Sequence, residues 1–165
     1  MLAESPNPIQ RGMNLSPDGR FVVYGSTSPS TKGDIWALPL GGDRKPIPLV
    51  QTKYDESSPQ VSPDGNWLAY RSDRTGRMEI HVRLFPNGPE EYQVSTDSGW
   101  AVKWRGDSRE LFWAKPGAAR LFSSELRVDG SSVQPGKPRE LIPTFGNDYV
   151  PAPDGQRFLL LTTAP

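Results

Sequence analysis

A four-residue motif returns along the chain at intervals of about 45 residues, and this repeat constrains the fold more than any other feature of the sequence. Ser16-Pro17-Asp18-Gly19 recurs as Ser62-Pro63-Asp64-Gly65, and in altered form as Arg105-Gly106-Asp107-Ser108 and Ala152-Pro153-Asp154-Gly155. The four aspartates are 46, 43 and 47 residues apart, and a run of aromatic and aliphatic residues follows each motif. The sequence is therefore built from one repeated supersecondary unit.

The motif has the residue preferences of a tight turn between two strands. Serine, proline and glycine at its first, second and fourth positions favour a type I turn followed by a residue with positive φ. Such a turn is a common connection between antiparallel strands. We therefore interpret the repeated aspartates as parts of turns and not as four copies of an acidic ligand site.

Each period contains further short apolar segments, so that one repeat supplies four strands. The strand after the turn is almost wholly apolar, as in Trp67-Leu68-Ala69-Tyr70, which is typical of a strand covered on both faces. The next strand alternates between apolar residues and the polar Glu79 and His81, which predicts one polar face. The last strand carries prolines such as Pro46 and Pro48, and proline belongs at a sheet edge.

Four-stranded antiparallel sheets that repeat with this period are the blades of a β-propeller. We expect an all-β chain that forms a partial propeller of about three and a half four-stranded blades, as a single domain over residues 1–165. The expected blades cover about residues 12–52, 56–96 and 99–143, with a half blade at 147–162. This makes about fourteen strands, of which the half blade supplies Asp148–Ala152 and Arg157–Thr162.

Composition removes several classes of function. Nineteen basic and nineteen acidic residues give no net charge, so we expect no nucleic-acid partner. The absence of cysteine excludes disulfides, thiolate zinc sites and a cysteine nucleophile. No apolar run approaches the ~18 residues of a membrane span, and the residues after Met1 do not form a signal peptide. We also expect no cofactor and no bound metal.

The sequence offers no catalytic constellation. His81 is the only histidine, so a Ser-His-Asp triad or a metal site of several histidines has no second candidate, and we expect it on a polar blade face. No Gly-x-Ser-x-Gly segment marks a serine hydrolase. The adhesion-like tripeptide Arg105-Gly106-Asp107 stands at the repeated turn position, which explains it without a role in adhesion.

Binding residues are expected where successive blades converge, at the rims and in the central channel. The polar residue two positions before each turn is a candidate, because equivalent positions lie near one another around a propeller axis; these residues are Asn14, Gln60 and Lys103. Trp100 is a further candidate contact, since it lies outside the repeated apolar positions. The other four tryptophans are expected to pack between blades: Trp36, Trp67, Trp104 and Trp113.

The motifs resemble a known family. Ser-Pro-Asp-Gly followed by an aromatic or aliphatic run is the blade signature of the TolB-like, WD-repeat-like β-propellers of bacteria, and the likeness extends from about Gly12 to Leu161. More narrowly, three segments resemble the propeller region C-terminal to bacterial membrane-anchored serine/threonine kinases: Gly33 to Pro46, Ile80 to Phe85 and Trp104 to Phe112. The chain departs from a kinase itself, because it has no Gly-rich nucleotide loop, His-Arg-Asp motif or Asp-Phe-Gly motif.

The resemblance implies a non-catalytic module that binds or scaffolds a protein or peptide partner, such as the extracytoplasmic sensory segment of a receptor-like kinase. Two alternatives stay open. One is a propeller that gates or supports a hydrolase or peptidase encoded elsewhere in the chain, and the other is a TolB-like periplasmic scaffold. A periplasmic or extracytoplasmic location is implied by the resemblance alone, because the residues themselves do not locate the chain.

The repeat length predicts that this chain needs further blades. At about 45 residues each, 165 residues make roughly 3.6 blades, fewer than the four to eight that close a propeller. A longer polypeptide, which we favour, or a second copy would supply the rest, because Phe158-Leu159-Leu160-Leu161 would otherwise form an unprotected apolar edge. We therefore expect oligomers or aggregates when the isolated chain is sedimented, and a stable monomer at high concentration would contradict the prediction.

Overall fold

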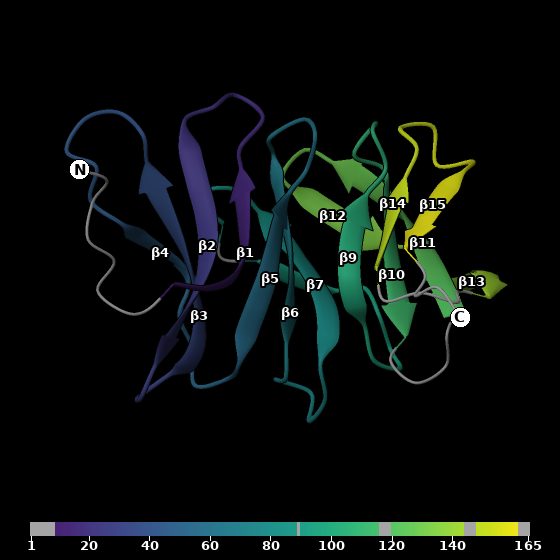
Figure 1. Cartoon of the computed structure of the whole chain (residues 1–165), viewed down its shortest axis with the longest axis horizontal. Coiled ribbons are helices and arrows are strands. Elements are labelled where there is room, and N and C mark those ends of the chain that lie inside the picture. Colours follow the sequence, from purple (N-terminus) through teal and green to yellow (C-terminus); the bar gives the residue numbers. More distant parts are fainter. Residues whose placement is uncertain (1–8, 89, 116–119, 144–147, 162–165) are drawn as a thin grey trace.

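Three antiparallel sheets and a hairpin stand side by side in chain order (Figure 1). The computed structural model describes residues 9–88, 90–115, 120–143 and 148–161, which contain strands and turns but no helix. Blade 1 consists of β1 (Ile9–Leu15), β2 (Phe21–Ser28), β3 (Lys32–Pro39) and β4 (Ile47–Val50). Blade 2 consists of β5 (Glu56–Val61), β6 (Trp67–Ser72), β7 (Glu79–Leu84) and β8 (Glu91–Gln93). The all-β architecture of four-stranded antiparallel blades is thus confirmed.

Blade 3 departs from the simple four-stranded pattern. It contains β9 (Trp100–Trp104), β10 (Glu110–Lys115), β11 (Arg120–Asp129), β12 (Ser132–Pro135) and β13 (Arg139–Pro143). The long strand β11 continues beyond Glu110, the residue at which its partner β10 begins. The chain then turns back, so that β12 pairs with the second half of β11, and β13 pairs with its first half. With the hairpin of β14 (Asp148–Pro151) and β15 (Phe158–Leu161), the described residues form fifteen strands and not the expected fourteen. Thr162, expected in the last strand, lies outside the described residues.

The blades are held together by side chains that alternate between their two faces. In β6, Trp67 and Ala69 pack against blade 3, whereas Leu68 and Tyr70 pack against blade 1. In β10, Leu111 faces blade 2 while Phe112 faces the hairpin. Because side chains of a strand point to opposite faces in turn, the nearly continuous apolar runs serve two interfaces at once.

The tryptophans follow this scheme with one exception. Trp67, Trp104 and Trp113 belong to the cluster that joins blades 2 and 3. Trp36 is half-buried and contributes to none of the buried clusters among the described residues, so its expected packing between blades is not observed.

The polar face that the alternating sequence predicts for the third strand of blade 2 is largely buried. Glu79 and His81 are both buried, with His81 only 2% exposed. Two acidic side chains meet a partner there: Arg77 pairs with Glu79, and Glu91 lies 3.2 Å from His81 Nδ1. The alternation in this sequence therefore marks a buried face with polar pairs and does not mark a face that meets water.

All four repeated turns share one backbone conformation. The fourth residue donates its N–H to the carbonyl of the first in each of them, at 2.8–3.0 Å, and it has positive φ: Gly19, Gly65, Ser108 and Gly155. In the first turn the aspartate serves the turn itself, because Asp18 accepts hydrogen bonds from the Ser16 hydroxyl and the Arg20 main chain, which lower the pKa of Asp18 to about 2. Both partners lie within two residues of Asp18, so this aspartate stabilises its own turn.

Ser108 keeps the left-handed conformation without being a glycine, and its side chain has a separate task. Its hydroxyl is buried and accepts a hydrogen bond of 3.0 Å from the main-chain N–H of Asp64 in the previous blade. The degenerate third turn is therefore also a link between blades 2 and 3.

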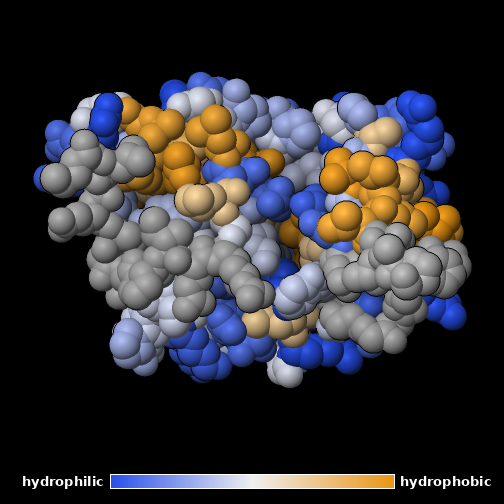
Figure 2. Space-filling model, in the orientation of Figure 1, coloured by the Kyte–Doolittle hydropathy of each residue, from blue (hydrophilic) through white to orange (hydrophobic). Residues whose placement is uncertain are grey.

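The two ends of the array expose apolar side chains. Figure 2 shows hydrophobic surface over blade 1 at one end and over the β14–β15 hairpin at the other. The exposed residues are Met13, Leu15 and Ile47 in blade 1, and Val150, Leu159 and Leu161 in the hairpin. The need for further blades stays a prediction, but these are the faces that such blades would cover.

Ser108 separates the effect of backbone strain from that of the link between blades. Ser108→Ala removes the hydrogen bond and keeps the strained φ, so we expect it to lower the free energy of unfolding by about 1 kcal/mol. Ser108→Gly also loses the bond but relieves a left-handed strain of about 1 kcal/mol, so it should stay near the wild type. Urea unfolding measures both values, and a Ser108→Ala variant as stable as Ser108→Gly would contradict the account.

Gly65→Val provides the reference for backbone strain alone. No heavy atom outside its chain neighbours lies within 4 Å of the position that a Cβ would take at Gly65, whose φ is 76°. A loss of more than about 1 kcal/mol on this substitution would therefore come from the backbone, because a β-branched residue resists positive φ.

Candidate functional site

The innermost strand of each blade carries a bulge at the same place. In β5, Ser58 and Pro59 together oppose Tyr70, and in β9, Ala101 and Val102 together oppose Trp113. The pairing of β1 with β2 is also interrupted between Gln10 and Asn14, where three residues oppose Tyr24 alone. A bulge leaves its extra residue out of the ladder and redirects nearby side chains, and such bulges often occur next to binding sites.

Each bulge contains a left-handed residue, and two of these are not glycine. Gly12, Ser58 and Ala101 have φ of 93°, 55° and 50°, and each lies six residues before the aspartate of its turn. Ser58 and Ala101 thus adopt a conformation that is energetically unfavourable for residues with a Cβ. Strain of this kind persists only where the surrounding structure imposes it, and it clusters at functional sites.

Two hollows meet at these bulges and form what we call the inner groove. The smaller, of about 190 Å³, is lined by Gly12, Ser58, Gln60, Trp100, Ala101, Val102, Lys103 and Asp148. The larger, of about 290 Å³, lies between blades 1 and 2 and includes Ser26, Asp55, Glu56 and Arg71. The hollows share Ser58 and Trp100, so the groove crosses β1, β5 and β9, which lie side by side along the near face in Figure 1.

Trp100 and Arg71 form the middle of the groove. The Arg71 guanidinium lies 4.0 Å from the centre of the Trp100 ring, and its Nε donates a 3.1 Å hydrogen bond to the Gly99 carbonyl. Trp100 remains 43% exposed, whereas burial lowers the pKa of the Arg71 side chain. The contact thus holds an aromatic ring in a fixed orientation at the surface.

The structure brings together three of the four candidate residues. Gln60, Lys103 and Trp100 line the smaller hollow. Asn14 does not line it, because its side-chain oxygen accepts a 2.8 Å hydrogen bond from the Val61 N–H and ties β1 to β5. Trp104 makes the corresponding tie one blade further along, since its indole N–H donates to the Gln60 carbonyl at 3.0 Å.

Sequence reasoning missed the other half of the groove. Arg71 and Glu56 are polar residues within strands, and nothing in their local pattern distinguishes them from the buried polar pairs elsewhere. Ser58 and Ala101 could have been suspected from their register, since they occupy the same place in the repeat as Gly12.

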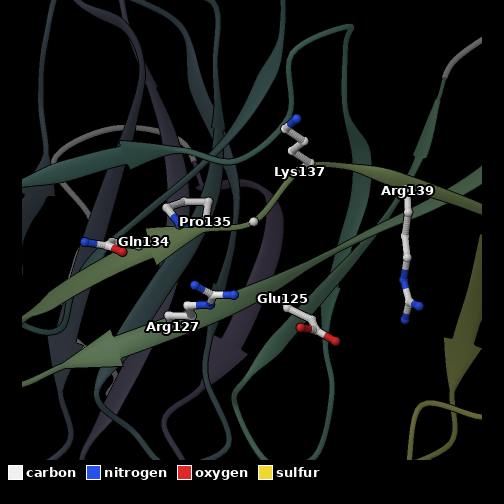
Figure 3. A pocket seen from close by; sticks show the side chains of 7 residues that line it. Glu125, Arg127, Gln134, Pro135, Lys137 and Arg139 are labelled. Atoms are coloured by element: carbon white, nitrogen blue, oxygen red, sulfur yellow. The ribbon is translucent and has the colours of Figure 1, made fainter.

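A separate hollow, which we call the outer hollow, lies at the outer side of blade 3. It has a volume of about 500 Å³ and is open at the break between β12 and β13, where Figure 3 shows basic side chains around it. Its charged residues are Glu125, Arg127, Lys137 and Arg139. Arg139 is already engaged, because it donates to the buried Glu110 and to Ser123.

His81 and the adhesion-like tripeptide are both occupied in the fold. His81 is buried beside Glu91; burial opposes the ionisation of Glu91, but hydrogen bonds from partners that include His81 and Arg74 lower its pKa to about 2. Arg105 pairs with Asp107 and Glu110, and the Gly106 N–H donates to the Pro153 carbonyl at 3.0 Å.

The described residues contain no group of three or more histidine, cysteine or acidic side chains placed to hold a metal. They also contain no helix with the length and hydrophobicity needed to cross a membrane.

Comparison with known proteins relates the chain to peptidases in sequence and to TolB in structure. Dipeptidyl-peptidase 5 of Aspergillus fumigatus is 32% identical over 149 residues, covering 73% of this chain and 21% of the relative. Tricorn protease homolog 1 of Streptomyces coelicolor is 29% identical over 114 residues, covering 68% of this chain and 10% of the relative. No family model matches the sequence.

The fold is that of a TolB-like β-propeller. The crystal structure of TolB from Acinetobacter baumannii superposes with a TM-score of 0.71 at 18% identity, over 94% of this chain and 38% of that one. The chain spans about a fifth of the length of the dipeptidyl-peptidases it matches. The likeness to TolB at this identity concerns the fold alone.

The strain at the inner bulges can be measured by substitution. Ala101→Gly relieves the left-handed φ and removes only a methyl group, so we expect it to raise the free energy of unfolding by up to about 1 kcal/mol. Gly12→Ala should lower it by at least about 1 kcal/mol, since its Cβ would lie 3.2 Å from the Ser58 Cα in a backbone with φ of 93°.

Ala69→Gly in the regular, buried strand β6 is the matched control for Ala101→Gly. It should destabilise the chain, because glycine gives the unfolded state more backbone freedom to lose on folding and relieves no strain at this position. Urea unfolding of the three variants tests the assignment, and destabilisation by Ala101→Gly comparable with that of Ala69→Gly would refute it.

Proposed function

We propose that this chain is a non-catalytic propeller module that binds an extended segment of another polypeptide in the inner groove. The course of the groove carries the proposal: its two hollows cross the inner strands of three successive blades and reach Asp148 at the start of the hairpin. A ligand that contacts all of these strands must be elongated.

The chemistry of the groove suits a peptide. Trp100 and Arg71 offer the aromatic and guanidinium surface that is enriched at protein interfaces and often dominates their binding energy. Lys103 can pair with a carboxylate of the ligand, and Asp148 with a basic side chain. The bulges leave main-chain groups out of the strand ladders, where they are free to bond to a peptide backbone.

The non-catalytic part of the proposal rests on the position of His81. General-base catalysis of the Ser-His-Asp type needs an imidazole that reaches the substrate. The imidazole of His81 is buried beneath blade 1 and its Nδ1 lies against Glu91, so it is held in a structural role.

The parent protein is a separate question, for which we propose a peptidase. The two sequence relatives described above are a dipeptidyl-peptidase and a tricorn protease homologue, and this supports a propeller that gates or supports a peptidase. A receptor-like kinase rests only on the resemblance of three sequence segments, and a periplasmic scaffold only on the fold shared with TolB. The coding sequence that flanks this segment separates the three, and a kinase and membrane span upstream would overturn the peptidase assignment.

The binding proposal is tested with selected peptides. A random library of unstructured 12-residue peptides is selected on the immobilised chain, and the affinity of the enriched peptides is measured by fluorescence anisotropy. We expect Trp100→Ala and Lys103→Ala each to weaken binding by about fivefold or more, the loss typical of a central interface residue.

Lys137→Ala is the matched control for Lys103→Ala, because it removes a lysine from the outer hollow. It should leave the affinity unchanged. Loss of affinity in Lys137→Ala, with wild-type binding in Lys103→Ala and Trp100→Ala, would place the peptide in the outer hollow and refute the proposal.

A further inference from the structure

Arg71 is the only basic side chain that is buried in the described part of the chain, and it forms no ion pair there. The residue is 7% exposed and lies in the middle of the inner groove. The buried Glu79 and Glu110, by contrast, pair with Arg77 and Arg105. An arginine stays charged in proteins, so its guanidinium is held here without a direct counter-ion, which is costly.

Only one of the three guanidinium nitrogens of Arg71 is engaged. Nε donates its hydrogen bond to the Gly99 carbonyl, and neither Nη1 nor Nη2 donates one to the described residues. Both Nη atoms keep some contact with solvent, unlike the Nε of Arg83, which is buried without a partner. Of the hollows described above, Arg71 lines only the larger one of the inner groove. The two unused nitrogens therefore face that hollow.

The guanidinium is fixed in place before any ligand arrives. The Trp100 ring covers one of its faces, with the guanidinium carbon 4.0 Å from the ring centre, and the bond to Gly99 holds the Nε side. The edge formed by Nη1 and Nη2 is left, and such an edge can donate two parallel hydrogen bonds to the oxygens of a carboxylate. Donors that are already ordered lose little conformational entropy on binding.

The acidic residues of the same hollow leave these donors unused. Burial lowers the pKa of Arg71 and the charge of Asp55, which also lines the hollow, counteracts this, but no ion pair joins the two side chains. One carboxylate oxygen of Asp55 lies against Gly33, where it would collide with any Cβ. Burial raises the pKa of Glu56, so this second acid ionises less readily than usual.

We propose that Arg71 is the receptor for a carboxylate of the bound polypeptide, which enters the larger hollow and accepts hydrogen bonds from Nη1 and Nη2. This inference rests on the function proposed above. A carboxylate suits the hollow better than a phosphate, because a single negative charge neutralises Arg71 and a second one would be repelled by Asp55. An acidic side chain and the C-terminus of a peptide offer the same chemistry.

The test uses a peptide enriched on the wild-type chain in the library selection. Each of its Asp and Glu residues is changed in turn to Asn or Gln, a further version carries a C-terminal amide, and fluorescence anisotropy measures the affinities. We expect one of these changes to weaken binding by about tenfold or more, the loss of a charged hydrogen-bonded pair. A loss on side-chain replacement identifies an acidic residue as the source, and a loss on amidation identifies the C-terminus.

A double-mutant cycle assigns that carboxylate to Arg71. Arg71→Met removes the guanidinium and keeps a long unbranched side chain, and the same change in the peptide should then alter the affinity by less than about twofold. Arg71→Lys keeps the charge without the planar fork and should give an intermediate effect, so the test does not depend on the folding of one variant. Lys103→Met is the matched control, in which the peptide change should weaken binding as much as in the wild type.

The outcomes separate this inference from the proposed function. A peptide that binds through Trp100 and Lys103 while none of its carboxylates is coupled to Arg71 overturns the inference and leaves the proposed function standing. A carboxylate coupled only to Lys103 has the same meaning. If Trp100→Ala and Lys103→Ala bind the peptide as the wild type does, the proposed function fails and the inference fails with it.

Discussion

Contact between the faces of neighbouring blades is the constraint on which the rest of the structure depends. A sheet that is apolar on both faces cannot leave either face in water. Blade 2 meets this condition fully, since Trp67 and Ala69 pack on one neighbour while Leu68 and Tyr70 pack on the other. The outer face of the hairpin does not meet it in this chain, and Leu159 there is 74% exposed.

The same packing positions the inner groove. Blades that are stacked by their faces bring their first strands side by side, and ties such as Asn14 to Val61 and Trp104 to Gln60 fix the register between them. Bulges that recur at one place in the repeat then fall next to one another. The groove is thus a product of repetition, and no single blade could form it.

The sequence predicted those features that short-range chemistry determines. The turn motif, the strand after it and the period of the repeat depend on residues a few positions apart, and they sufficed for the fold class. The hydrogen bond by which Asn14 links β1 to β5 could not be read from the repeat, because its partner Val61 is 47 residues away.

Features that depend on distant partners were not predictable in this way. The burial of His81, for example, follows from the packing of its blade against its neighbour and not from its own strand. The β11–β12 hairpin also escaped prediction, because β12 lies between Asp129 and the prolines of the outer strand in a segment that reads as a loop.

Hydrogen–deuterium exchange with and without a selected peptide measures the central claim, ligand binding in the inner groove, most directly. The account predicts slower exchange in β5 and β9 when the peptide is bound, because their unpaired main-chain groups become bonded or shielded there. Exchange in β12 and β13, on the far side of blade 3, should not change. Protection confined to β12 and β13, or to the exposed β14–β15 hairpin, would contradict it.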